Sequence, residues 1–435
     1  MTRTRAVLPV VLAGLATLAV AAQAPLAVET FDMAWTVVRD KHFDKTLNGV
    51  DWTAVRDELR PKASAARNTG ELRGVLRDML GRLGQSHFAI IPASATGAAA
   101  GGAGHPGFDV RRVGADLLVS GVDAEGPAAR AGVRTGWRVT AIEGAPVTDL
   151  MRSLPVDAHE RLVNLEAWRI AQNRLRGEVG SKVTVTFDDG ASGSPAVSIE
   201  RRAEKGEPVT VGTLPTMFVR VDSGKRPTPA GGTAGVIRFN VWMAAVDAPF
   251  QRAVDEFRTA SGIVIDLRGN PGGLAAMMMG IAGHFVPDRR PLGVMKTREN
   301  EVRFAVNPRL VSAAGTPVEV YAGPVAILVD ALSGSASECF AGGMQSLKRA
   351  RVFGQTSMGQ ALPALFQRLP NGDVMIHAYG DFVTSDGTRL EGRGVVPDEE
   401  VPLVRDDLLA GRDRTLEAAL AWIDRAARGG EPQRH

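Results

Sequence analysis

The stretch PVAILVDALSGSASECFAGGMQSLKRARVFGQT, from Pro324 to Thr356, indicates the fold of the C-terminal half of the chain. It begins with an apolar run typical of a buried strand, passes through a Ser/Gly-rich turn and continues with a helical pattern before a second short strand. Similar units, in which apolar strands are separated by helices, precede it from about residue 235. This alternation predicts parallel βαβ units and an α/β domain, which we expect over residues 235–408.

Three serines, Ser333, Ser335 and Ser337, crowd the turn after the first strand. Ser335 and Glu338 have the S-x-x-E spacing of a capping box, so one interpretation is that Ser335 only caps the helix. The same position suits a nucleophile, because a serine at a strand-to-helix turn projects its hydroxyl outward beside an unpaired N–H group. That N–H belongs to Ala336 and could stabilise an oxyanion. Ser335 is therefore the best placed of the three serines.

A glycine turn one strand earlier, DLRGNPGGL from Asp266 to Leu274, could supply a second oxyanion donor. Gly272 and Gly273 can adopt positive φ and expose bare N–H groups. The alternatives are a simple connector or a phosphate cradle, although the turn lacks the lysine of a P-loop.

The rest of the chain divides into segments with different sequence patterns. Residues 23–95 carry helical patterns, and residues 104–203 carry short strand patterns with glycine turns, which predict a small β domain. Residues 204–234, polar and rich in Pro and Gly, are interpreted as a linker. A strand-like pattern at 388–397 is assigned to the α/β domain, and residues 409–435 to a C-terminal helix and tail.

The N-terminus has the order of a secretory signal peptide. Arg3 and Arg5 precede the apolar run of residues 6–20, and small residues follow. We expect residues 1–22 to be removed by cleavage after Ala22, which predicts an exported protein, periplasmic or extracellular. A retained membrane anchor is the alternative, although the run is short for a span of about 20 residues. No later stretch is long and apolar enough to span a membrane, so none is expected after cleavage.

Composition excludes several classes of function. The net charge is +3, and Lys and Arg are interleaved with Asp and Glu, so no basic stripe indicates nucleic-acid binding. The single cysteine, Cys339, excludes an intrachain disulfide. Histidines and carboxylates show no metal-ligand spacing, so neither a metal nor another cofactor is expected.

Three ordered motifs, DLRGNPGG, SASE at the start of a helix and TRLEGRGVVPDEEV, resemble those of the C-terminal processing (tail-specific) serine peptidases. This superfamily includes the tricorn protease core. The segments GHPGF and GVDAEGPAARAGVRTGWRVTAIEGAPV are similar to its PDZ domain. The resemblance implies a crotonase-like (ClpP-like) α/β peptidase core with an N-terminal helical segment and an inserted PDZ-like β domain. It also implies Ser335 as nucleophile, with oxyanion donors from Ala336, Gly272 and Gly273.

The general base differs from that of most relatives. Most processing peptidases use a lysine from a Phe-Gly-Lys-Gly turn, whereas this chain has Met358-Gly359-Gln360-Ala361, and glutamine cannot act as a base. The chain resembles the tricorn branch instead: Ser86 and His87 in GQSHFAII match its Ser-His pair, and Glu391 in LEGRGVVPD matches its acidic member. The resemblance implies His87 as base, oriented by Glu391, with Ser86 bridging the two.

From residue types alone the assignment stays open, because the other histidines and the nearby Asp381 and Asp386 are rivals. With Glu391 beside it, His87 is expected to titrate at about pH 6–7.5 in kcat/KM.

The PDZ-like segment could bind an extended peptide, with the amides of Gly107 and Phe108 receiving its terminal carboxylate. A structural lid is the alternative.

The leading hypothesis is an exported serine peptidase that hydrolyses peptide bonds in peptides or unfolded protein tails, its only expected partners. The alternative is a catalytically silent PDZ-bearing scaffold that binds peptides. Acyl-CoA chemistry on a crotonase-like core is a third reading, against which the PDZ-like insert argues.

Overall fold

The computed structural model describes residues 10–95, 104–155, 159–191, 193–212 and 216–429, with side chains from residue 25 onwards. The chain forms two compact units. The first comprises Met1–Thr96, Met295–Val302 and Leu362–Asp381, and the second comprises Gly97–Val294, Arg303–Ala361 and Phe382–His435. The predicted signal peptide, residues 1–22, lies outside the residues whose side chains are described.

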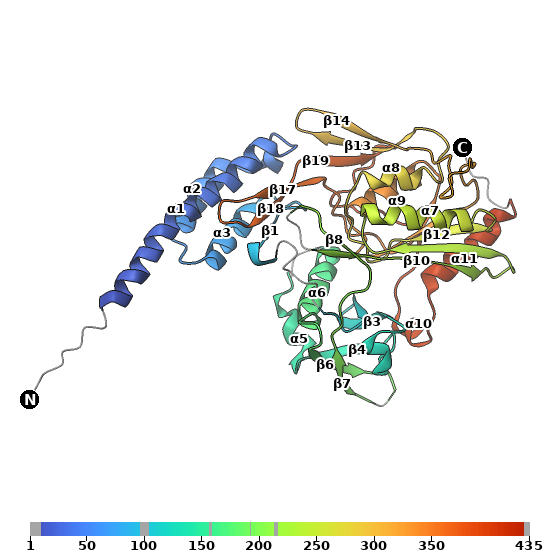
Figure 1. Cartoon of the computed structure of the whole chain (residues 1–435), viewed down its shortest axis with the longest axis horizontal. Coiled ribbons are helices and arrows are strands. Elements are labelled where there is room, and N and C mark those ends of the chain that lie inside the picture. Colours follow the sequence, from blue (N-terminus) through green and yellow to red (C-terminus); the bar gives the residue numbers. More distant parts are fainter. Residues whose placement is uncertain (1–9, 96–103, 156–158, 192, 213–215, 430–435) are drawn as a thin grey trace, which may run out of the picture. The chain divides into compact units, whose positions relative to one another are not determined.

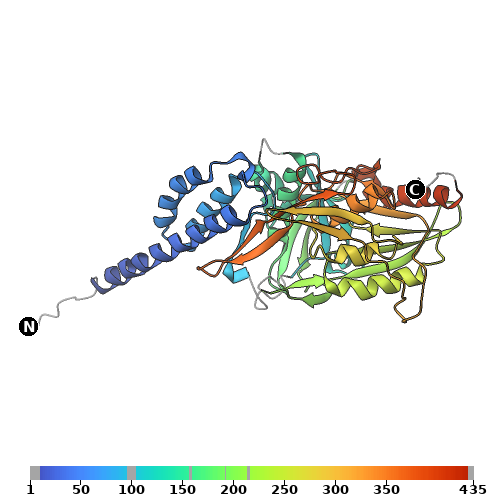
Figure 2. The ribbon, with the colours of Figure 1, turned by 90° about the horizontal axis from the view of Figure 1, so that it is seen from above.

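The first unit contains three helices, α1 (Val10–Lys41), α2 (Trp52–Ser64) and α3 (Thr69–Gly81), which lie side by side in Figure 1 and Figure 2. Asp51 and Asn68 cap the second and third helices through their side chains. The core is built from the apolar faces of all three helices, and includes Phe31, Leu59 and Leu76. Within the described residues, no helix combines the length and the apolar character needed to span a membrane.

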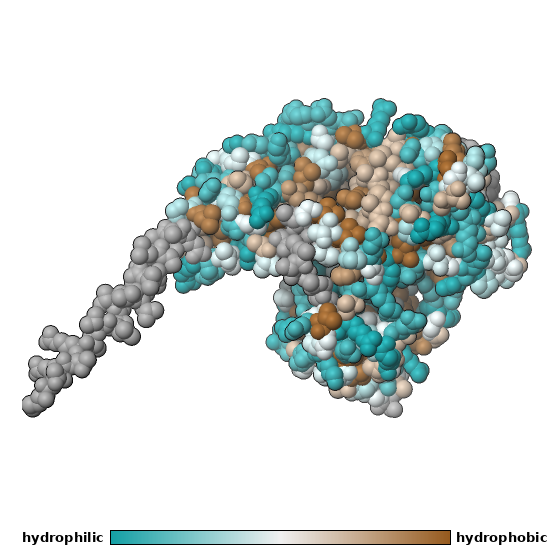
Figure 3. Space-filling view, in the orientation of Figure 1, coloured by the Kyte–Doolittle hydropathy of each residue, from teal (hydrophilic) through white to brown (hydrophobic). Residues whose placement is uncertain are grey.

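A three-stranded antiparallel sheet completes this unit. Its order is β1 (Ala89–Ile91), β18 (Val374–Ala378) and β17 (Ala364–Arg368). Leu369 and Met375 belong to the same core as the helices. Residues 362–381, which sequence patterns placed in the α/β domain, therefore group with the helical segment. On the visible face of the helices, hydrophobic residues form separate spots among hydrophilic ones (Figure 3).

The second unit is organised around a six-stranded sheet with the order β10-β11-β12-β15-β16-β20. Strands β11 to β20 are parallel and β10 is antiparallel at the edge. The prediction of parallel βαβ units is confirmed. The strand bounds are β10 (Val221–Pro227), β11 (Thr233–Phe239), β12 (Gly262–Asp266), β15 (Val325–Val329), β16 (Arg351–Gly354) and β20 (Glu399–Glu400).

Helices cover both faces of this sheet. The amphipathic α11 (Arg414–Ala427) buries Leu420 and Ile423 against Ala326 and Leu328 of β15. Further helices lie together on the opposite face (Figure 1). They are α7 (Asp247–Glu256), α8 (Met277–Ala282) and α9 (Ala336–Ser346). The order strand β15, turn, helix α9, strand β16 is the one predicted from residues 324–356.

The β-rich segment folds into a sheet with the order β2-β3-β4-β6-β7, with β5 paired to β4. A sixteen-residue helix, α6, packs against β2 and was not predicted. The bounds are β2 (Phe108–Val113), β3 (Asp116–Val122), α4 (Pro127–Arg130), β4 (Arg138–Ile142), β5 (Ala145–Pro146), α5 (Val147–Leu150), α6 (Glu160–Leu175), β6 (Lys182–Asp188) and β7 (Ala196–Glu200).

Two interpretations from sequence are wrong. The expected linker at 204–234 contains strands β8 (Glu207–Val209), β9 (Met217–Val219) and β10, because polar residues can occupy an exposed edge strand while a Pro/Gly turn joins it to β11. Residues 388–397 form turns, with Gly392 and Gly394 at positive φ, and no extended strand. The hairpin-forming strands β13 (Pro291–Thr297) and β14 (Glu301–Ala305) were missed; they form a sheet with β19 (Gly380–Thr384), and a short helix α10 spans Arg405–Leu409.

Candidate active site

Ser335 lies at the turn between β15 and α9 and is half-buried. Its backbone has φ +51° and ψ −118°, a conformation that residues with a side chain rarely adopt. Such strain persists only where the surrounding structure fixes it, and it concentrates at functional sites. The strained serine at a strand-to-helix turn is the geometry of a nucleophile elbow.

The neighbouring serines are buried and use their hydroxyls in the scaffold. Ser333 Oγ donates to the carbonyl of Leu267 at 2.8 Å and accepts the N–H of Asp330 at 2.9 Å. Ser337 Oγ donates to the carbonyl of Asn270 at 3.0 Å and accepts the indole N–H of Trp242 at 2.9 Å.

The glycine turn lies directly against Ser335. Gly272 and Gly273 have φ of +104° and +140°, so both need the freedom of glycine. A Cβ atom on Gly272 would lie 2.9 Å from the nitrogen of Ala336. Because the strand ends of β12 and β15 are adjacent in the sheet, the turn and the serine meet at its carboxyl edge.

The predicted oxyanion donors have different hydrogen-bonding states. Gly272 N–H donates to Asn270 Oδ1 at 3.0 Å, so it is occupied. For the N–H groups of Gly273 and Ala336 there is no acceptor among the described residues. Of the three predicted donors, these two are the ones available to an oxyanion.

A buried carboxylate that sequence patterns used only as a helix cap lies beneath this turn. Glu338 accepts the Ser335 N–H at 3.0 Å, so the arm of the capping box that reaches back is present. The same carboxylate accepts three further hydrogen bonds from residues 357–360. Burial raises the pKa of Glu338 to about 7, against the effect of these donors.

Glu391 is half-buried next to the turn of residues 358–361. Its Oε2 accepts the N–H of Ala361 at 2.9 Å. The following Gly392 N–H donates to the carbonyl of Gly359 at 2.9 Å. Arg161 of α6 donates to the carbonyls of Gly392 and Arg393, both at 2.5 Å, and so ties the β-rich segment to this loop.

In the helical unit, His87 follows α3 and has φ +61°, another strained backbone. Its Nδ1 lies 2.8 Å from Ser86 Oγ, the neighbouring residue. Burial lowers the pKa of His87 to about 4, because loss of hydration disfavours the charged imidazolium. The turn is anchored by the buried His42, whose Nε2 lies 2.8 Å from Gln85 Oε1.

The rival residues have structural surroundings. Asp386 accepts the N–H of Thr388 at 3.1 Å within a turn. His284 is 2% exposed among Phe250 and Phe285, and neither of its ring nitrogens has a hydrogen-bond partner among the described residues. His377 is buried on β18.

No lysine is placed to act as a desolvated base. All eight lysines lie in the described part of the chain, and each is exposed: Lys41, Lys45, Lys62, Lys182, Lys205, Lys225, Lys296 and Lys348. A catalytic lysine must be neutral, which requires burial to lower its pKa from about 10.4.

Of the two predicted peptide-binding amides, that of Gly107 is engaged in the fold. Gly107, at φ +85°, donates its N–H to His105 Nδ1 at 3.1 Å. Phe108 is buried and pairs with Val122 across β2 and β3.

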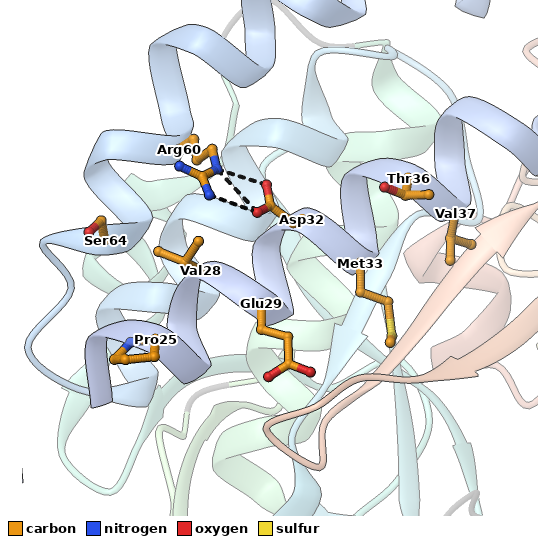
Figure 4. Close-up of a pocket in the computed structure, with 9 residues that line it drawn as sticks. All are labelled: Pro25, Val28, Glu29, Asp32, Met33, Thr36, Val37, Arg60 and Ser64. Atoms are coloured by element: carbon orange, nitrogen blue, oxygen red, sulfur yellow. Dashed lines mark hydrogen bonds and ion pairs between the residues drawn. The ribbon is translucent and has the colours of Figure 1, made fainter. Parts of the chain in front are cut away.

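A metal cluster or a pocket would be a further kind of site among the described residues. Among the described residues there is no cluster of three or more potential metal ligands. A shallow groove runs along α1 and α2 (Figure 4), where Arg60 and Asp32 face each other in an ion pair. Its charged centre is thus satisfied internally.

Comparison with known proteins fits this geometry. Residues 233–401 match the model of peptidase family S41, and residues 28–81 match the tricorn protease C1 domain. The chain therefore carries a peptidase family S41 domain, the family of serine-type peptidases. The resemblance to the C-terminal processing and tricorn peptidases is confirmed.

Named relatives of this S41 peptidase fall into both groups. A carboxyl-terminal-processing protease of Picosynechococcus sp. is 26% identical over 386 residues, 85% of this chain and 82% of the relative. A C-terminal processing peptidase of Tetradesmus obliquus, named chloroplastic, is 26% identical over 88% of this chain and 79% of the relative. Tricorn protease homolog 1 of Streptomyces coelicolor is 25% identical over 90% of this chain but 34% of the relative.

Solved structures share the fold of this S41 peptidase. The photosystem II D1 C-terminal processing protease aligns with a TM-score of 0.58 at 22% identity, over 91% of this chain and 98% of that one. Mature CPAF aligns with a TM-score of 0.64 at 14% identity, over 93% and 98% of the two chains. The predicted α/β fold is confirmed at this level.

Proposed function

We propose that this S41 peptidase hydrolyses peptide bonds in peptides or unfolded protein tails with Ser335 as nucleophile, His87 as general base and Glu391 as its acidic partner. The observation that carries the proposal is the strained turn at Ser335, next to two N–H groups without acceptors. Ser335 combines a strained backbone, partial exposure and nearby oxyanion donors. The hydroxyls of Ser333 and Ser337 instead donate hydrogen bonds to backbone carbonyls.

In the proposed reaction, Ser335 Oγ attacks the carbonyl carbon of the scissile peptide bond and transfers its proton to His87. The oxyanion that forms accepts hydrogen bonds from Gly273 N–H and Ala336 N–H. His87 then donates the proton to the leaving amine, and water hydrolyses the acyl-enzyme by the reverse sequence of proton transfers. Glu391 orients the imidazole and stabilises its charged form, with Ser86 as the bridge.

The exposure of the lysines favours His87 over a lysine as the base. Every lysine is exposed, so none has the burial that neutralises an amine near neutral pH. Burial lowers the pKa of His87 to about 4, which keeps the imidazole neutral but makes it a weak base, so the proposed role needs the carboxylate of Glu391 to raise that pKa towards the working pH.

The β-rich segment is proposed to be a PDZ-like domain on a crotonase-like core. Its edge strand β2, packed against α6, is the arrangement to which an extended peptide adds as a further strand. Because Gly107 N–H bonds to His105, capture of a terminal carboxylate there requires the His105 ring to move. Export is proposed from residues 1–22; N-terminal sequencing of secreted protein should start at Gln23.

A fluorophosphonate probe tests the proposed nucleophile. The parent protein should be labelled and should hydrolyse an unfolded protein substrate, and Ser335→Ala should lose both. The matched variants Ser333→Ala and Ser337→Ala should keep labelling in their folded fraction. Turnover by Ser335→Ala would overturn the assignment, and peptide binding without labelling of the parent would favour the silent scaffold.

A further inference from the structure

Glu338 is a fully buried carboxylate whose two oxygens accept four hydrogen bonds. Oε2 accepts Ser335 N–H at 3.0 Å and Gln360 N–H at 2.9 Å. Oε1 accepts Ser357 Oγ–H and Gly359 N–H, both at 2.6 Å. An ionised carboxylate has about four lone-pair positions, so the four donors match the ionised form.

These contacts exceed what a helix cap needs. A capping box requires only the bond to the Ser335 N–H, whereas three of the four donors come from residues 357–360. A buried charge is costly and is kept only with its hydrogen bonds. The guanidinium of Arg161, from α6, interacts electrostatically with Glu338.

The turn that Glu338 holds, residues 357–361, also contacts Glu391. Ser335 N–H donates to the carbonyl of Gln360 at 2.9 Å, so nucleophile and turn are joined a second time. The next residue, Ala361, donates its N–H to Glu391 Oε2. Ser357 Oγ in addition accepts Val395 N–H at 2.6 Å, which fixes the far end of the loop that carries Glu391.

We propose that Glu338 is a positioning residue, which sets the distance between the nucleophile Ser335 and the acidic residue Glu391 through the backbone of residues 357–361. The proposal rests on the proposed function of Ser335 and Glu391. Glu338 touches neither substrate nor reacting atoms; it acts through the main chain of the turn.

Glu338→Gln keeps the volume of the side chain but leaves fewer acceptor positions than the four donors need. The new NH₂ group must replace one of the two oxygens. At the Oε1 position it would face Gly359 N–H, and at the Oε2 position it would face Ser335 N–H and Gln360 N–H. Either orientation leaves at least one backbone N–H facing another donor, so the turn must shift.

The first measurement is amide hydrogen exchange of the full chain, which does not depend on catalysis. In Glu338→Gln, the amides of Gly359, Gln360 and Ala361 should exchange at least tenfold faster than in the parent. Asp373→Asn is the matched control, because Asp373 is another fully buried carboxylate that accepts a backbone N–H, that of Ala93. Exchange at residues 359–361 should be unchanged in the control.

The second measurement is turnover per folded enzyme. A misplacement of about 1 Å costs on the order of 10²-fold, so kcat of Glu338→Gln should fall by about this factor with KM within threefold and Tm within about 4 °C. Gln360→Ala should keep the parent kcat, since the turn uses only the main chain of Gln360. Unchanged exchange, or a loss of activity that only follows loss of folded protein, would overturn the positioning role. A third outcome is faster exchange in Glu338→Gln together with a parent protein that neither reacts with the probe nor hydrolyses substrate. This outcome would refute the proposed function and limit the role of Glu338 to shaping the turn.

Discussion

Gly272 and Ser335 approach so closely that a Cβ atom on the glycine would lie 2.6 Å from the Cβ of the serine. Real Cβ atoms do not come this near to each other, so Gly272→Ala must push the glycine turn away from the nucleophile. We expect kcat/KM to fall by about 10²–10³-fold, the cost of losing one oxyanion donor. Gly315→Ala is the control, because Gly315 also has positive φ, +79°, but open space around it. If the two variants lose kcat/KM equally, the loss comes from backbone strain at a positive φ and not from the close approach of residue 272 to Ser335.

The pH dependence of kcat/KM should show two acidic steps. The first, near pH 7, reflects protonation of Glu338, which must then give up one of its four donors; the second, near pH 4, reflects protonation of the base His87. A profile from pH 3.5 to 9 with a stable substrate measures both. A single step near pH 6.5 would mean that His87 titrates with its ordinary pKa.

His284 should make the protein less stable in acid. Burial, together with the charge of Arg309, lowers the pKa of His284 to about 4 from an ordinary 6.5. The unfolded chain therefore binds this proton more tightly, and the contribution of His284 to stability is complete above about pH 6.5 and lost as the pH falls towards 4. In His284→Phe, or in the smaller His284→Leu, the drop in Tm between pH 8 and pH 5 should be smaller than in the parent protein.

The exposed His159 provides the control, and His159→Gln should leave the difference between Tm at pH 5 and Tm at pH 8 unchanged. If the His284 variants also leave it unchanged, another group is responsible for the acid sensitivity.

The ion pair between Arg111 Nε and Asp330 Oδ2, at 2.9 Å, joins strand β2 to the carboxyl end of β15. Asp330 Oδ1 accepts the N–H groups of Gly269 and Leu332, so the same carboxylate holds the glycine turn and the serine turn. Arg111→Met leaves this carboxylate buried without its cation, which typically costs about 3–5 kcal/mol. We expect a clear loss of Tm and of turnover.

Arg112→Met on the same strand is the matched control, since Arg112 bonds only to Asn164 and Glu160 of the β-rich segment and should have a small effect on turnover. A harmless Arg111→Met would show that Asp330 is neutral or hydrated. Because of this ion pair, deletion of residues 104–203 would disturb the catalytic turns as well as substrate binding.

Sequence patterns predicted the parts of the fold that local rules encode. The apolar runs of β12 and β15 are buried on both faces of a parallel sheet, and the turn that carries Ser335 lies between strand and helix as the pattern predicted. Helix α6 was missed because it faces the sheet with a mixture of small, polar and apolar residues, including Ala171 and Gln172, which gives a weak helical period.

The contacts of Glu338 could not be predicted, because its partners follow it by 19 to 22 residues and bind through the main chain. The spacing S-x-x-E gave the only signal. The lowering of the His87 pKa by burial was equally inaccessible to sequence patterns, because it depends on residues distant in the chain.

In the turn at residues 358–361, Gln360 contributes its main chain: its N–H donates to Glu338 and its carbonyl accepts the N–H of Ser335. These contacts do not depend on which side chain stands at position 360. With His87 as the proposed base, this position is therefore open to neutral drift: side chains of different chemistry could replace one another there while the turn keeps its hydrogen bonds.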